Sequence, residues 1–352
     1  MKIRPILLGA GILFVATAIG SVALINSLNG FETVAAYSGP TCAKVPGIVG
    51  AEDIVPDYQR GIAYVSSNDR RAALAGDEQP GAIYLLDLNN PRRSQAVKMS
   101  GTENLASFHP HGADLLEVEG ERYLFVLSHR AHEKPDEGHD VYVFQIEGTR
   151  LNLVNHVDHA GIRSPNDIAA VSLSKFYFTN DRGFTSPTGN FLEIGLALET
   201  SDVSFFDGEQ PVLMDQMAFA NGIAFDRTRD KVYVTALREG AVRVYARDPQ
   251  TNGLTQTGTL PGGGAPDNVT LDEGGDLWTA SHENLMALTD HMADGSALSP
   301  ARAFHTDPHS GETELVYEDD GRQLSAISVI VPTDTKLLLG AIFDDGILVC
   351  NR

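Results

Sequence analysis

Cysteine is nearly absent from this sequence of 352 residues, which contains only Cys42 and Cys350. Neither cysteine lies in a cluster that could ligate zinc, so a cysteine-based zinc site is not expected. The two cysteines stand at the two ends of the main body of the chain. In an exported protein such a lone pair favours one disulfide, and the alternative is two unrelated buried thiols. A disulfide over this span requires the two chain ends to meet in space.

Basic residues are also scarce, because 26 Lys and Arg face 47 Asp and Glu and give a net charge of -21. No basic stripe is present, so nucleic acid is not an expected partner. An acidic surface favours solubility and the binding of cations. No linker rich in Ser, Gly or Pro interrupts the chain between the two cysteines, which favours a single domain over residues 40–352.

Long apolar runs are absent except at the N-terminus. Lys2 and Arg4 precede a stretch without charge that lasts until Glu32. Its apolar part is nearer the length of about 20 residues that spans a membrane than the shorter core of a signal peptide. A weak cleavage candidate, "TVAAY", lies at 33–37. We therefore expect residues 1–30 to be an uncleaved signal-anchor in the membrane, with the body exported to the extracytoplasmic side; a cleaved signal peptide is the alternative.

Residues 40–352 lack helical periodicity and contain short segments with the pattern of strands instead. No stretch longer than about a dozen residues shows a helical pattern, and residues 191–205 are the best candidate for a short helix or an excursion of the chain. Six segments are instead rich in β-branched and aromatic residues and are separated by turn signals, which predicts strands. These segments are 82–88, 122–129, 140–146, 175–181, 231–237 and 241–247.

One plan repeats along the body: a polar or glycine step, an apolar strand, a turn and a second apolar strand. It recurs about every 50 residues, which is typical of a β-propeller with four strands in each blade. The copies include 110–126, 165–179, 220–235 and 266–280, with a further polar step at Glu52 and a less polar sixth copy at 324–341. We therefore predict an all-β, six-bladed β-propeller with four-stranded blades. Its closed ring would bring the two cysteines together.

The polar steps predict a central cation site. If each step opens the innermost strand of its blade, the steps converge at one mouth of the channel. Except for one histidine they are oxygen donors, and clustered oxygens suit calcium, which takes about 6–8 such ligands. A single Asn at a strand entry is usually a turn residue, but equivalent positions in five repeats are harder to explain that way. The residues are Glu52, His111, Asn166, Asn221, Asp267 and Asn268.

These motifs together resemble the paraoxonase/arylesterase family of calcium-dependent lactonases with a six-bladed propeller. The resemblance covers residues 40–352, including both cysteines, and the apolar N-terminal segment also resembles that family. The matching segments are "EDI" (52–54), "SFHPHG" (107–112), "SH" (128–129), "NDI" (166–168), "TND" (179–181), "FANGI" (219–223), "DN" (267–268), "GDLW" (275–278) and the terminal "LLLGAIFDDGILVC".

The resemblance implies two calcium ions per chain and a set of pocket residues. The catalytic calcium is expected on Glu52, Asn166, Asn221, Asp267 and Asn268. The structural calcium is expected on Asp53, Asp167 and the carbonyl of Ala113. His111 and His129 are expected to form a catalytic dyad, with His282 and Phe219 shaping the substrate pocket.

Neighbouring ligands are expected to serve different ions, because successive residues of a strand point to opposite faces. Glu52 and Asp53 would divide in this way, as would Asn166 and Asp167. The pair at 267–268 departs from the rule, since the resemblance sends both residues to one ion.

The implied activity is hydrolysis of lactones and of aryl or carboxylic esters. Calcium would polarise the carbonyl, and His111 or a metal-bound carboxylate would activate water. The sequence departs from the family at Ser281, where well-known members have a free cysteine, and in the acidic, arginine-containing loop 66–81, which lacks an aromatic gate. The alternatives are an enzyme like the gluconolactonases or strictosidine synthases, and a calcium-binding propeller without catalysis.

Overall fold

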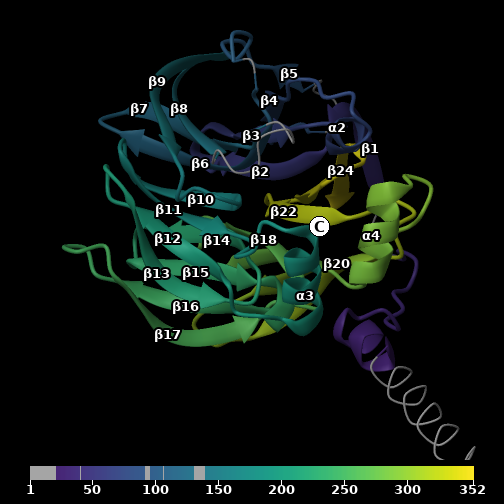
Figure 1. The fold of residues 1–352 in the computed structure, drawn as a ribbon. Helices are drawn as coiled ribbons and strands as arrows, with labels where there is room; N and C mark the ends of the chain where they lie inside the picture. The colour runs from purple at the N-terminus through teal and green to yellow at the C-terminus, as the bar shows by residue number, and fades with distance from the viewer. Residues whose placement is uncertain (1–20, 40, 92–95, 106, 131–138) are drawn as a thin grey trace, which may run out of the picture.

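The computed structural model describes residues 21–39, 41–91, 96–105, 107–130 and 139–352. They form six four-stranded antiparallel sheets arranged as the blades of a propeller (Figure 1). The innermost strands β2, β6, β10, β14, β18 and β22 contact one another in a closed ring around the axis. The predicted six-bladed, four-stranded propeller is confirmed.

Five blades are continuous in sequence. The first two consist of β2 (Ala51–Asp57), β3 (Ile62–Ser67), β4 (Ala82–Asp87) and β5 (Val97–Lys98), and of β6 (Pro110–Val118), β7 (Glu121–Ser128), β8 (His139–Glu147) and β9 (Arg150–His159). The next two consist of β10 (Pro165–Ser172), β11 (Lys175–Asn180), β12 (Ser201–Phe206) and β13 (Pro211–Met217), and of β14 (Ala220–Asp226), β15 (Lys231–Ala236), β16 (Ala241–Arg247) and β17 (Leu254–Pro261). The fifth consists of β18 (Pro266–Leu271), β19 (Leu277–His282), β20 (Ala301–Thr306) and β21 (Thr313–Asp319).

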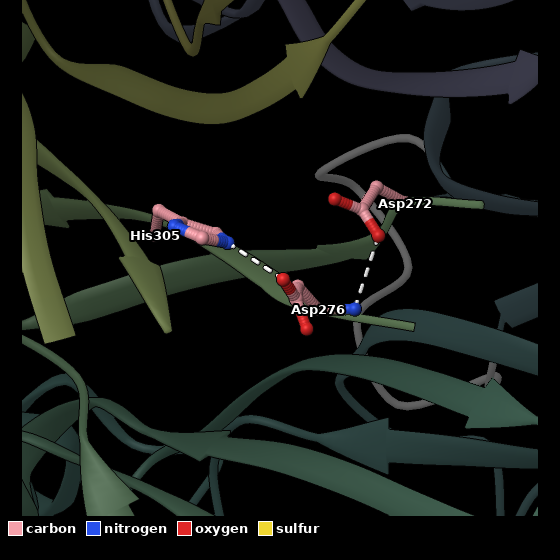
Figure 2. A group of neighbouring side chains, drawn as sticks. All are labelled: Asp272, Asp276 and His305. Carbon is pink, nitrogen blue, oxygen red and sulfur yellow. Dashed lines mark hydrogen bonds and ion pairs between the residues drawn. The ribbon is translucent and has the colours of Figure 1, made fainter. Parts of the chain in front are cut away.

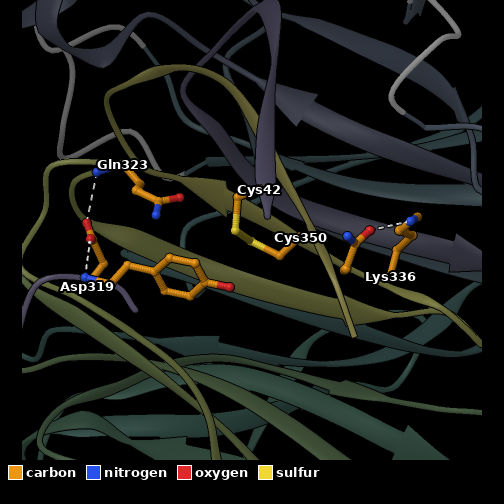
Figure 3. The surroundings of a disulfide bond; sticks show 7 residues. Cys42, Asp319, Gln323, Lys336 and Cys350 are labelled. Atoms are coloured by element: carbon orange, nitrogen blue, oxygen red, sulfur yellow. Dashed lines mark hydrogen bonds between the residues drawn. A yellow bond between two sulfur atoms is a disulfide. The ribbon is translucent and has the colours of Figure 1, made fainter. Parts of the chain in front are cut away.

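The sixth blade joins the two ends of the chain and closes the ring. Its inner strands are β22 (Ile327–Pro332), β23 (Lys336–Ala341) and β24 (Asp345–Asn351), and the N-terminal β1 (Cys42–Val49) completes the sheet. Cys42 lies opposite Cys350 in this pairing, and the two form a disulfide (Figure 3). The predicted disulfide is therefore confirmed.

The core lies between adjacent blades. Inner and middle strands are almost wholly buried, because the sheets pack face to face and leave no solvated side, while outer strands such as β17 are largely exposed. One core cluster, for example, joins the sixth and first blades through Ile54, Val331 and Leu338. The β-branched and aromatic residues that predicted strands supply this packing.

Within the described residues of the propeller, three α-helices and two 3₁₀ turns interrupt the blades. They are α2 (Arg70–Leu74), α3 (Pro187–Leu196), α4 (Leu285–Ala293), η1 (Tyr58–Arg60) and η3 (Leu237–Glu239). Residues 21–27 are also helical, and they lie with α2, α3 and α4 on one side of the propeller in Figure 1. The predicted membrane segment falls mainly on residues 1–20, outside the described residues. Among the described helices, none is long and apolar enough to cross a bilayer.

Each innermost strand contains a β-bulge at its start. The pairing register shifts between Ala51 and Ile54 in β2, and at the equivalent place in the other five inner strands. A bulge re-aims side chains and breaks strict alternation. The polar steps of the repeat fall inside these bulges, which is why Asp267 and Asn268 need not point to opposite faces.

Candidate functional site

The second residue of every innermost strand is polar, and these residues meet at one end of the channel. They are Glu52, His111, Asn166, Asn221, Asp267 and Ser328. The sixth blade contributes Ser328, which sequence reasoning missed because its repeat is the least polar. Its hydroxyl donates a hydrogen bond of 2.7 Å to the Glu52 carbonyl.

Two glycines let the inner strands approach closely enough to form this cluster. A Cβ at Gly112 would lie 2.5 Å from the Asp167 Cα, and a Cβ at Gly222 would lie 2.6 Å from the Asn268 Cα. Such contacts are too short for any side chain. These glycines therefore hold β6 against β10 and β14 against β18 at the level of the polar residues.

Direct contacts join residues of the first, second and fifth blades. Asn268 Nδ2 donates to Glu52 Oε1 at 2.9 Å and to the Glu52 carbonyl at 3.1 Å. Glu52 Oε1 is also 3.6 Å from His111 Nε2. Asp267 Oδ2 accepts a hydrogen bond from His282 Nε2 at 2.8 Å. The structure thus brings these predicted residues into one cluster.

Four buried oxygens of this cluster have no hydrogen-bond partner. They are Glu52 Oε2, Asn166 Oδ1, Asn221 Oδ1 and Asn268 Oδ1. Buried acceptors are almost always satisfied in folded proteins, so four unsatisfied ones on facing strands call for a cation. Hard oxygen ligands of this kind match calcium. The chemistry of the donor set therefore fits the metal that the sequence implied.

Burial raises the carboxyl pKa values of this region. Burial raises the pKa of Glu52 well above its ordinary value. The positive charge of Arg70 lowers this pKa in part, and the negative charges of Asp267 and Asp53 raise it further. Burial raises the pKa of Asp53 to about 7. Ionised carboxylates are costly in such a place unless a cation neutralises them.

A second acidic cluster lies beside the first. Ala113 N–H donates to Asp53 Oδ2 at 2.8 Å, and Ile223 N–H donates to Asp167 Oδ2 at 2.7 Å. Burial and then the Asp53 charge raise the pKa of Asp167 well above its ordinary value. Asp53, Ala113 and Asp167 line a cavity of about 290 Å³ that neither Glu52 nor Asn166 lines. The adjacent pairs 52–53 and 166–167 thus face different surroundings.

The two predicted dyad histidines stack on each other. The ring centroids of His111 and His129 are 4.6 Å apart with an interplanar angle of 18°. His129 Nε2 bonds the Pro165 carbonyl at 2.7 Å. Burial, then the charge of Arg70, lowers the pKa of His111 well below its ordinary value, and burial lowers that of His129 to about 3. Both rings are therefore neutral at physiological pH.

An apolar cavity of about 550 Å³ lies under the helices on this side of the propeller. Phe219, two residues before Asn221, lines it, and so does Leu285, three residues after His282. Further walls come from α3, α4 and the N-terminal residues, including Phe191, Leu24 and Leu28. Ser281, the position lacking the family's cysteine, is buried and its Oγ accepts from Ala265 N–H at 3.0 Å.

A separate group that was not predicted, Asp272, Asp276 and His305, lies on the turn between β18 and β19 and on β20 (Figure 2). Asp272 Oδ1 already accepts from the N–H groups of Gly274 and Asp276, and its Oδ2 accepts from Trp278 Nε1. Asp276 Oδ2 bonds His305 Nε2 at 2.9 Å. This group is satisfied internally and stabilises a hairpin.

Comparisons with known proteins agree with this architecture. The Arylesterase family model matches residues 34–351. The chain is 31% identical to "Serum paraoxonase/arylesterase 1" of Rattus norvegicus over 90% of each chain, and 28% identical to "Serum paraoxonase/arylesterase 2" of Homo sapiens over 96% of this chain and 97% of that one. Among solved structures, a gluconolactonase from Xanthomonas campestris superposes with a TM-score of 0.54 at 14% identity, covering 91% of this chain and 99% of that one, which shows the shared fold. The chain belongs to the arylesterase family.

Proposed function

We propose that this protein is a calcium-dependent hydrolase of lactones and of aryl or carboxylic esters. The observation that carries the proposal is the set of four unpartnered, buried oxygens at one end of the channel. Membership of the arylesterase family supports the ester-hydrolase class. We further propose that Glu52, Asn166, Asn221, Asp267 and Asn268 hold a catalytic calcium, and that Asp53, Asp167 and the Ala113 carbonyl hold a structural one.

The charge of the first set suits this role. Glu52 and Asp267 carry two negative charges and the three asparagines are neutral, so one divalent cation is formally neutralised. When bound, calcium supplies a Lewis acid that polarises the substrate carbonyl and favours negative charge on its oxygen. The residues of this chain would hold the cation and orient the carbonyl carbon for attack.

Water activation requires a proton acceptor in the cluster. The sequence offers two candidates, His111 and a carboxylate of the cation site. His129 supports the His111 ring by stacking. His282 is bonded to Asp267, so it fixes that carboxylate and shapes the pocket.

The apolar cavity that Phe219 lines favours lipophilic substrates. Its walls are largely aliphatic and aromatic, and Phe219, Phe343 and Ile194 are among them. A sugar lactone would leave several hydroxyl groups unpaired there, at a cost of about 1–3 kcal/mol each. An alkyl-substituted lactone or a phenyl ester would instead bury apolar surface.

A substrate panel tests this function. We expect hydrolysis of γ- and δ-lactones with alkyl chains and of phenyl acetate, with kcat/KM for the alkyl lactones at least about tenfold above that for gluconolactone. Preference for the sugar lactone would move the protein to the gluconolactonase-like class. If calcium raised the melting temperature but no ester or lactone were turned over, the protein would be a binding propeller.

Calcium affinity is expected to fall in acid. Burial raises the carboxyl pKa of Asp53 to about 7, so this group is largely protonated at pH 6 and must release its proton to bind calcium; the raised pKa values of Glu52 and Asp167 act in the same direction. The protonated form therefore competes below pH 7, and affinity rises as pH increases. We expect calcium to bind at least about tenfold more weakly at pH 6 than at pH 8. Calorimetric titration at the two pH values, with proton release measured in two buffers, checks this; equal affinities would contradict it.

We also propose that the protein works on the extracytoplasmic side, anchored through its N-terminal segment. The Cys42–Cys350 disulfide supports an oxidising compartment. Within the described part of the N-terminal segment, Leu24 and Leu28 line the apolar cavity.

A further inference from the structure

Arg70, which the sequence did not single out, reaches into the polar cluster from the loop that departs from the family pattern. It is the first residue of α2, whose N-cap Asp69 accepts a hydrogen bond from Ala72 N–H at 2.9 Å. This cap fixes the start of the helix and so directs the Arg70 side chain inward. Its guanidinium is partly buried, and Nη2 lies 2.8 Å from His111 Nδ1.

The same guanidinium ties three blades together. Nη1 donates to the carbonyls of Gly50 at 3.2 Å and Ile342 at 3.4 Å, and Nη2 donates to the Pro110 carbonyl at 3.3 Å. Gly50 joins the sixth blade to the first, Ile342 follows β23 of the sixth blade, and Pro110 begins β6 of the second blade. The position of Arg70 relative to His111 is therefore fixed by several independent contacts.

This contact decides which nitrogen of His111 carries the proton. An arginine side chain only donates hydrogen bonds, so Nδ1 of His111 must accept. In a neutral imidazole the proton then resides on Nε2. Nε2 points toward the cation site, where Glu52 Oε1 lies 3.6 Å away. With Nδ1 occupied by Arg70 and Nε2 protonated, neither nitrogen has a free lone pair to take a proton from water.

We propose that Arg70 is a positioning residue that holds His111 in the Nε2–H form, so that His111 donates a hydrogen bond to the substrate carbonyl oxygen. This inference rests on the proposed function and decides between the two proton acceptors named above. His111 keeps its proton throughout. The water oxygen forms a bond to the carbonyl carbon while its proton passes to a carboxylate of the cluster. The bond between the carbonyl carbon and the alcohol oxygen then breaks, and that oxygen takes the proton from the carboxylate, which leaves the acid and the alcohol as products.

The test begins with the tautomer itself, in the calcium-loaded protein. Histidine-selective ¹⁵N labelling and long-range ¹H–¹⁵N spectra report which ring nitrogen is protonated, and the His111 signals are those lost in His111→Gln. We expect an Nε2–H ring in the wild type and in Arg70→Lys, which keeps a donor. We expect a mixture of tautomers in Arg70→Met, which keeps the bulk of the stem but has no donor.

Kinetics supply the second readout. Arg70→Met is expected to lower kcat for an alkyl lactone at least about tenfold while changing KM less than about threefold. The double variant with His111→Gln should be no slower than His111→Gln alone, because Arg70 acts through that ring. Arg71→Gln is the matched control: Arg71 Nη2 contacts His291 on α4 at 3.1 Å, so its loss should leave the His111 tautomer unchanged.

The outcomes separate this inference from the proposed function. An Nδ1–H ring in the wild type, a tautomer unaltered in Arg70→Met, or additive effects in the double variant would each overturn the role of Arg70. The wild-type tautomer can be read without any Arg70 variant, and needs only His111→Gln to fold so that the His111 signals are assigned. Absence of any lactone or ester hydrolysis would overturn the proposed function instead, while the spectra would still report on the contact between Arg70 and His111.

Discussion

Glu52→Gln is expected to reduce lactone hydrolysis at least about a thousandfold, the scale of losing a major electrostatic stabiliser. Glu52 supplies one of the two negative charges of the proposed catalytic set, and its Oε2 is a buried oxygen without a partner. Glutamine keeps the size of the side chain but halves the formal charge of the set. Because calcium affinity depends on the number of charged ligands, occupancy and carbonyl polarisation should both fall.

The same substitution should not weaken the calcium-free fold. Burial raises the pKa of Glu52 because the ionised form is unfavourable there, and a neutral glutamine removes that cost. We therefore expect the melting temperature of Glu52→Gln in EDTA to equal or exceed that of the wild type. Loss of activity with retained stability distinguishes a cation ligand from a residue that merely supports the fold.

EDTA treatment of the wild type should reproduce the loss, and excess calcium should restore activity. Glu209→Gln is the matched control, since Glu209 is exposed on the turn between β12 and β13. Wild-type turnover that survives exhaustive chelation, or Glu52→Gln activity within tenfold of the wild type, would remove calcium from the mechanism.

The strands and the ring closure could be predicted from sequence because the signals are local and repeated. Segment 241–247 coincides with β16, and 82–88 differs from β4 by one residue. The segment 191–205 was harder because it contains two elements. Residues 191–196 form the end of α3, and the helix stops because the following Ala197 takes a positive φ of 50°. Residues 201–205 belong to β12.

Arg70 could not be found from sequence, because its role depends on contacts between distant parts of the chain. Helix α2 spans five residues, too few for helical periodicity to show. Arg70 contacts the ring of His111 and the carbonyl of Ile342, which lie 41 and 272 residues further along the sequence. A bulge relaxes strict alternation without abolishing it, so the observed register permits both residues of the pair 267–268 to face the same site, which the sequence pattern alone did not explain.

Asp167→Ala and Asn166→Ala are expected to fail in different ways, although the residues are neighbours. Asp167 Oδ1 accepts from Ile168 N–H at 2.8 Å, and Oδ2 accepts from Ile223 N–H in the next blade. Alanine leaves both buried donors unpaired and removes a proposed ligand of the structural calcium. We expect a loss of about 3 kcal/mol in the free energy of unfolding with calcium present.

Asn166→Ala is expected to lower activity and to change stability little. The Asn166 Oδ1 has no partner within the protein, so Asn166→Ala should cost less than about 1 kcal/mol of stability. The loss should appear in kcat, because a ligand of the proposed catalytic calcium is gone. Calcium-dependent melting curves and lactone kinetics on both variants measure the two effects side by side.

Chelation makes this comparison sharper. In EDTA the Asp167→Ala defect should shrink, because the variant also removes the repulsion between Asp167 and Asp53 that raises the pKa of Asp167. A defect of equal size with and without calcium would mean that Asp167 acts only through its hydrogen bonds. If both variants lost activity alone, Asn166 and Asp167 would serve one site, and a single cation would account for the cluster.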